Sequence, residues 1–112
     1  MESTRQLKIS RLLQKELSEV FLFEARNLFG HAMITVTKVH VAKDLSIAKV
    51  YLSLFGVMEK KELFKSIDNH TKEIRRALGM RVKQQLRVVP ELHFFMDDSL
   101  DYIENIDKLL KE

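Results

Sequence analysis

Residues 33–55 read MITVTKVHVAKDLSIAKVYLSLF and contain two runs that are rich in β-branched residues. Residues 33–42 and 48–55 are therefore predicted to be strands, because side chains branched at Cβ pack well on a pleated sheet. In the second run every second residue is aliphatic, which is typical of a sheet with one buried face. Only residues 43–46 join the two runs, so we expect an antiparallel hairpin.

A helical pattern precedes the hairpin. Ser3 followed by Gln6 is a capping-box pair, and apolar residues then recur at steps of three and four. This spacing predicts an amphipathic helix that runs to about Arg26 and ends before Gly30. Lys8, Arg11 and Lys15 share the exposed face of this helix.

A second helical pattern follows the hairpin, from Glu59 to Leu86. An unbroken helix of about 27 residues would be about 40 Å long, which exceeds what so small a domain can cover. We therefore expect a break, either at Gly79, the one helix breaker inside the pattern, or within residues 69–72. If the helix continues, Lys72, Arg76, Lys83 and Arg87 lie within about 60° of one another, opposite the apolar stripe.

The last part of the chain predicts one more strand and one more helix. Pro90 ends the long helical pattern, and residues 92–96 alternate as in a strand. Tyr51, Phe55 and His93 are candidate stacking residues if their face of the sheet is open, but periodicity favours burial of Phe55 and Phe95. Asp97, Asp98 and Ser99 are good caps for a short final helix. The order helix, strand, strand, broken helix, strand, helix predicts an α+β fold with a three-stranded sheet.

Composition narrows the class of protein. The 112 residues suffice for one domain, and the absence of Cys excludes disulfides, thiolate nucleophiles and Cys-bound zinc. No apolar run approaches the ~18 residues of a membrane span, so we expect a cytoplasmic protein. The four histidines fall in different elements, and no phosphate-loop, dinucleotide or metalloprotease motif occurs. We therefore expect neither an enzyme nor a bound metal or cofactor, and we ascribe Asp97, Asp98 and Asp101 to helix capping.

Charge is divided unevenly along the chain. Residues 72–87 carry six bases and one acid, and residues 1–15 carry four bases and one acid. Residues 91–112 reverse the sign, with seven acids and two bases. Clustered bases on a helix predict a surface that faces phosphates. The predicted RNA-contacting residues are Lys72, Arg75, Arg76, Arg81, Lys83 and Arg87 as the main surface, with Lys8, Arg11 and Lys15 as a flank.

The chain carries four distinctive motifs: VTKV at 36–39, DLSIAKVYLS at 44–53, IRRALG at 74–79 and VPELHFFMDDS at 89–99. In this order they resemble the motifs of the ribosome-binding factor A family of bacterial small-subunit assembly proteins. The resemblance covers nearly the whole chain, from the first helix to Leu110.

The resemblance implies a type II KH-like fold for residues 1–112 as a single RNA-binding domain. It implies that the protein binds immature 30S subunits through 16S rRNA and helps in late maturation and 5′-end processing of that rRNA. It also implies a role in growth at low temperature. It further implies release by an assembly GTPase. We also expect the protein to act as a monomer. Arg75 and Arg76 carry over as RNA contacts. The Ala-x-Gly kink of the family falls here on residues 70–72, which contain neither Ala nor Gly.

A second function class is compatible with the same residues. The acidic final helix, with Asp101, Glu104 and Asp107, could dock a basic ribosomal protein and leave RNA contacts incidental. Truncation after Ser99 separates the two hypotheses, because only the protein-docking hypothesis then predicts loss of association. The third and most remote hypothesis is a metal-dependent enzyme that uses Asp97 and Asp98.

Overall fold

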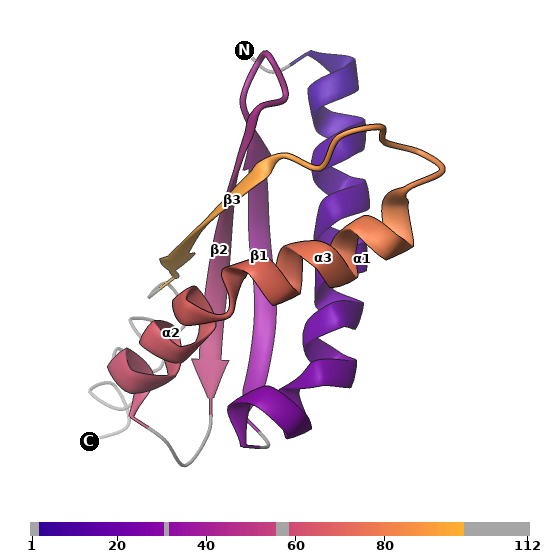
Figure 1. Cartoon of the computed structure of the whole chain (residues 1–112). Helices are drawn as coiled ribbons and strands as arrows, with labels where there is room; N and C mark the ends of the chain where they lie inside the picture. The colour runs from indigo at the N-terminus through magenta and orange to yellow at the C-terminus, as the bar shows by residue number, and fades with distance from the viewer. Residues whose placement is uncertain (1–2, 31, 56–58, 98–112) are drawn as a thin grey trace, which may run out of the picture.

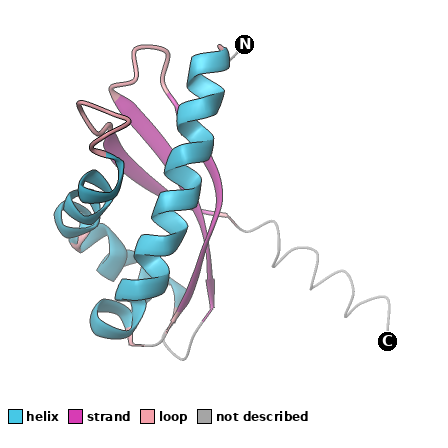
Figure 2. Ribbon diagram, turned by 90° about the vertical axis from the view of Figure 1, so that its right-hand side faces the viewer, coloured by secondary structure: helices cyan, strands magenta, loops and turns pink. Residues whose placement is uncertain are grey.

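The computed structural model describes residues 3–30, 32–55 and 59–97. Three strands form one sheet in the order β1-β2-β3, with β1 and β2 antiparallel and β2 and β3 parallel. The helices lie on one side of this sheet, as Figures 1 and 2 show. The predicted α+β order is confirmed as far as β3, whereas the predicted final helix lies outside the described residues. The elements are α1 (Thr4–Phe29), β1 (Met33–Val41), β2 (Ile47–Phe55), α2 (Lys60–Asn69), α3 (Thr71–Val82) and β3 (Glu91–Met96).

The first helix begins and ends as the sequence predicts. The Ser3 hydroxyl accepts a hydrogen bond from the Gln6 amide at 3.1 Å, and the Gln6 side chain accepts one from the Ser3 amide at 2.8 Å. This reciprocal pair satisfies two backbone donors that the first turn leaves open. Gly30 adopts the left-handed conformation, φ 61°, that commonly ends a helix. Helix α1 therefore extends three residues beyond the predicted Arg26.

The hairpin contains a β-bulge that the sequence analysis did not predict. Val36 pairs with Leu52, but Lys38 pairs with Tyr51, so Thr37 is an extra residue in β1. Because side chains alternate along a strand, this extra residue shifts which positions of β1 face the helices. The buried residue before the bulge is Val36, at an even position, and those after it are at odd positions.

The long helical pattern breaks at His70, not at Gly79, so the prediction of a kink at the glycine is wrong. The His70 ring nitrogen Nδ1 lies 2.7 Å from the Ser66 carbonyl oxygen, and the Thr71 hydroxyl donates to the Asp68 carbonyl at 2.6 Å. These side chains occupy carbonyl groups of the last turn of α2, which turns the chain without Gly or Pro. The break falls within residues 69–72, the second predicted position.

Helix α3 also ends four residues earlier than the apolar pattern predicts. The Val82 carbonyl accepts hydrogen bonds from the amides of Gln85 and Leu86, which closes a turn after the last helical residue. Residues 83–90 then return along the molecule to β3 and are called the return segment below. A continued helix would carry the chain away from the edge of β2, where β3 pairs.

The core lies between the sheet and the three helices. The fully buried side chains include Leu13 and Leu17 of α1, Val50 of β2 and Leu78 of α3. The prediction that Phe55 and Phe95 are buried is wrong, because both belong to the other face of the sheet and are 37% and 41% exposed. No helix in the part of the chain that the structure describes is long and apolar enough to cross a bilayer.

Candidate nucleic-acid interface

Helix α3 presents its cations by burying the opposite face. Ile74, Leu78 and Val82 are buried at helical spacing, so Lys72 and Arg76 project from the solvent side, where both are exposed. The break at His70 sets the direction of this helix independently of α2. The exposed cations of α3 therefore stand on a helix that the core holds in place.

The return segment lies directly against α3. Gly79 faces the segment, and a Cβ atom at that position would lie 3.4 Å from Cγ2 of Val89. Arg75 fixes the segment, donating hydrogen bonds from Nε to the Pro90 carbonyl at 3.2 Å and from Nη2 to the Val89 carbonyl. Arg75 is thus both a cation of the surface and the link that holds the return segment.

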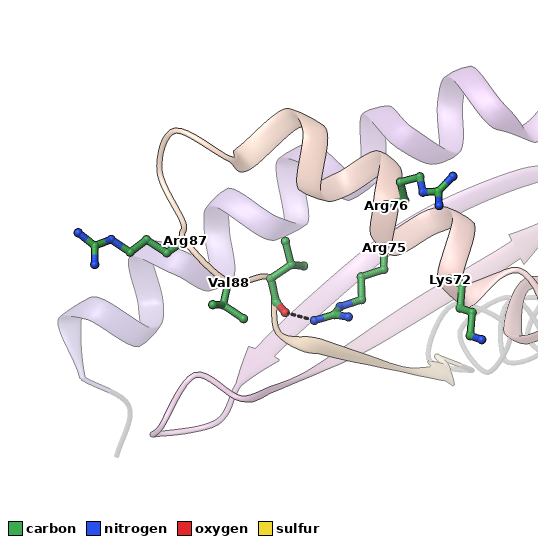
Figure 3. Close-up of a pocket in the computed structure, with 6 residues that line it drawn as sticks. Lys72, Arg75, Arg76, Arg87 and Val88 are labelled. Atoms are coloured by element: carbon green, nitrogen blue, oxygen red, sulfur yellow. Dashed lines mark hydrogen bonds between the residues drawn. The ribbon is translucent and has the colours of Figure 1, made fainter.

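An open pocket forms between α3 and the return segment. Its volume is about 550 Å³, and we call it the α3 pocket. It is lined by Lys72, Arg75, Arg76, Arg87, Val88 and Val89. In Figure 3, Lys72, Arg76 and Arg87 point in different directions while Arg75 reaches across to the return segment, so the four cations do not converge on one point. Such an arrangement suits a run of phosphates along a polyanion better than a single small anion.

The cations of the α3 pocket keep their charge available. Among the described residues, no carboxylate forms an ion pair with Lys72, Arg76 or Arg87. Arg75 donates two of the five N–H groups of its guanidinium to backbone carbonyls, so three remain for other acceptors. Both carbonyl partners are neutral, so Arg75 also retains its positive charge for an external anion.

Arg81, which was predicted as part of the main surface, does not line the α3 pocket. Its Nε donates to Glu16 at 2.7 Å, its Nη2 donates to Glu19, and its guanidinium lies 5.9 Å from the centre of the Phe23 ring. The hydrogen bond to Glu16, assisted by Glu19, raises the pKa of the Arg81 guanidinium. Arg81 therefore neutralises two carboxylates of α1 and packs α3 against that helix.

The other predicted RNA contacts are placed less uniformly. Lys83 is exposed and caps the end of α3. Arg87 reaches the α3 pocket from the return segment and not from a continuing helix, so its predicted position on the helical face is wrong. Lys8, Arg11 and Lys15 are exposed together on α1, as predicted, but they do not line the α3 pocket.

Arg5 is a cation that the prediction of contact residues missed. A second pocket of about 570 Å³ lies between α1, the hairpin turn and the return segment, and both Arg5 and Arg87 line it. Arg87 therefore joins this pocket to the α3 pocket. The high density of bases before Lys15 was the available signal, but it did not show which of them would face the return segment.

The predicted acidic end can be followed only to Asp97. The Asp97 carboxylate accepts a hydrogen bond from the Thr37 hydroxyl at 2.6 Å, which ties the end of β3 to the bulge. Asp98, Asp101 and the acidic helix predicted for protein docking lie outside the described residues. Within residues 3–30, 32–55 and 59–97, no group of three or more His, Asp or Glu side chains could hold a metal ion.

The α+β architecture, with a broken helix pair and a three-stranded sheet, places the chain among KH-like domains, and solved structures agree. A crystal structure of ribosome-binding factor A from Thermus thermophilus is similar, with a TM-score of 0.64 and 25% identity, over 81% of this chain and 94% of that one. A homology model of the Thermus thermophilus factor, fitted into the cryo-EM map of a 30S complex, gives a TM-score of 0.60 and 23% identity, over 88% of this chain and 97% of that one.

The sequence comparisons identify the family. The family model described as Ribosome-binding factor A matches residues 5–110, and the chain belongs to this family. The Ribosome-binding factor A of Cytophaga hutchinsonii is 45% identical over all of this chain and 84% of its own length. That of Flavobacterium johnsoniae is 48% identical over 98% of this chain and 85% of its own.

Proposed function

We propose that this protein binds 16S rRNA in free or immature 30S subunits and assists late maturation of the small subunit. The observation that carries the proposal is the α3 pocket, in which Lys72, Arg76 and Arg87 have no carboxylate partner among the described residues. Membership of the ribosome-binding factor A family supports it, as does the 30S complex into whose map the Thermus thermophilus factor was fitted.

The mechanism that we propose is electrostatic and non-enzymatic. Successive phosphates of an rRNA segment lie along α3 and the return segment, and each contact releases condensed counterions. Lys72, Arg75, Arg76, Lys83 and Arg87 supply the main contacts. Lys8, Arg11 and Lys15 on α1 form a weaker flank. The surface contributes affinity but little sequence preference, because phosphate contacts carry no base information.

We infer further properties from the same family resemblance. The protein acts in the cytoplasm as a monomer, assists processing of the 16S rRNA 5′ end, and matters most in the cold. An assembly GTPase promotes its release from the subunit.

Co-sedimentation in sucrose gradients tests the proposal. The wild-type protein should sediment with free small subunits and be depleted from complete ribosomes. Arg76→Glu should weaken small-subunit binding about tenfold or more, because it removes one phosphate contact and adds a repulsive charge beside the others. Lys65→Glu is the matched control, since it makes the same charge change on the exposed side of α2, away from the α3 pocket. Equal loss in the two variants, or enrichment on complete ribosomes alone, would contradict the proposal.

A further inference from the structure

The sheet has an outer face, defined as the face turned away from the helices, and it carries aromatic and basic side chains in register. Tyr51 of β2 is paired on one side with Lys38 of β1 and on the other with Phe95 of β3. Lys49, two residues before Tyr51, is likewise flanked by His40 and His93. Two neighbouring cross-strand rows thus combine rings and cations, about 7 Å apart along β2.

The two rings of the first row form a stacked pair at the surface. The ring centres of Tyr51 and Phe95 are 5.4 Å apart, and the ring planes differ by 26°. Phe95 is 41% exposed. By contrast, Phe21 and Phe29 on the helical side are fully enclosed. The outer face therefore presents a partly exposed aromatic pair, called the aromatic platform below, against which an unstacked nucleobase can pack.

The cations beside the platform are available to an external anion. Lys38 and Lys49 are exposed, and neither has a carboxylate partner among the described residues. The carboxylates of β3 and its end lie beyond the rings on both sides. Glu91 is 3.7 Å from the His93 ring nitrogen Nε2, and Asp97 accepts the hydrogen bond from Thr37. The lysines thus flank the aromatic pair while the acids mark the two ends of the platform.

We propose that the outer face is a second nucleic-acid surface, which takes a single-stranded RNA segment. Bases stack on Tyr51 and Phe95, and the neighbouring phosphates meet Lys38 and Lys49. A duplex does not fit this chemistry, because its bases are stacked inside the helix and cannot cover the rings. A second copy of this chain fits less well, since it would bring the same lysines against each other. Figure 2 shows the helices on the opposite side of the sheet, and residues of α3 line the α3 pocket, so the partner of the outer face is a different RNA segment.

Binding of a fluorescently labelled ten-nucleotide uridine oligomer tests this inference. Phe95→Leu keeps apolar area but removes the ring, and it should weaken oligomer binding at least about fivefold. Lys49→Gln should weaken binding and make the negative slope of log K against log salt shallower by about 0.7. Ile47→Thr is the matched control, because it removes apolar area from the same face without removing a ring, and it should change affinity less than twofold.

Photocrosslinking locates the contact independently of affinity. An oligomer containing 4-thiouridine should crosslink to peptides of β2 and β3 in the wild type and in Arg76→Glu. Crosslinks confined to α3 and the return segment would overturn the inference. So would unchanged affinity in both Phe95→Leu and Lys49→Gln, or a wild-type dimer in sedimentation that Phe95→Leu dissociates. Oligomer binding that persists without any small-subunit binding would refute the proposed function but not this surface.

Discussion

At the scale of single residues, Arg75 shows that one side chain can serve two purposes. Its guanidinium bridges two successive carbonyls, those of Val89 and Pro90, while its charge lines the α3 pocket. Arg suits this position because its planar fork reaches both acceptors at once, whereas the Lys ammonium is a point charge on a flexible stem. The bridge keeps Arg87 and the rest of the return segment beside α3.

The expected consequence is that Arg75→Lys destabilises the protein although the charge is kept. We expect a loss of about 1 kcal/mol in the free energy of unfolding, measured by urea denaturation, because about one net hydrogen bond disappears. Amide hydrogen exchange in residues 83–90 should become faster. Arg76→Lys is the matched control on the next residue, and it should stay within about 0.5 kcal/mol of wild type, since no described residue accepts a hydrogen bond from Arg76. Equal effects of the two substitutions would refute the bridging role.

The sequence predicted the basic residues as a set but not their separate partners. Arg75, Arg76 and Arg81 are identical in type and lie within one helix, yet they face a backbone segment, solvent and two carboxylates respectively. A helical wheel places Arg81 on the flank of the apolar stripe, but it does not reveal that Glu16 and Glu19 lie opposite. Such pairings depend on which helices pack together, and that is decided by the whole fold.

At the scale of the elements, Gly79 lies inside a continuous helix and not at the predicted kink. Helix α3 continues through it without a break, and its Cα faces Val89 of the return segment. A Cβ atom added at Gly79 would lie 3.4 Å from the Val89 side chain, which is close to an ordinary van der Waals contact. An alanine therefore fits with little or no displacement, and its better helix propensity remains as a gain.

We accordingly predict that Gly79→Ala stabilises the protein by about 0.5–1 kcal/mol in thermal or urea unfolding. Gly30→Ala provides the opposite case. Nothing lies within 4 Å of a Cβ at Gly30, but its φ of 61° is unfavourable for alanine, so that variant should lose about 1 kcal/mol. Destabilisation by Gly79→Ala would mean that the return segment cannot yield even slightly at Val89.

Element order was predictable because periodicity, caps and turn residues agree along the chain, whereas three details depend on tertiary contacts. The break at His70 uses side-chain bonds to the backbone and contact of the His70 ring with Phe29, at 5.5 Å between ring centres. The bulge at Thr37 is held by Gln14 of α1, whose amide donates to the Thr37 carbonyl at 3.3 Å. Phe94 and Phe95 are adjacent and both aromatic, so the sequence alone does not show which of them faces the core. The pairing of β3 with β2 decides it.

At the scale of the whole molecule, the cations fall into groups with different surroundings. Lys72 and Arg76 belong to the α3 pocket, whereas Lys8 and Lys15 lie on the exposed face of α1. Glu16 and Glu19 also belong to α1, at its contact with α3, and there one guanidinium serves both carboxylates. The local negative potential of that pair weakens the attraction of a phosphate chain toward α1. The two groups should therefore contribute unequally to RNA binding.

The salt dependence of small-subunit binding measures this inequality. Replacing both Lys72 and Arg76 by Gln should reduce the magnitude of the negative slope of log K against log salt by about 1.5, which corresponds to two lost phosphate contacts. The same replacement of Lys8 and Lys15 removes equal charge, and so it keeps the net-charge change matched. We expect the replacement of Lys8 and Lys15 to reduce the magnitude of the slope by less than about 0.7, the value for one phosphate contact. Equal reductions of the slope in the two double variants would mean that α1 and α3 belong to one continuous RNA-binding surface. A larger reduction for the α1 variant would mean that α1 carries the main surface.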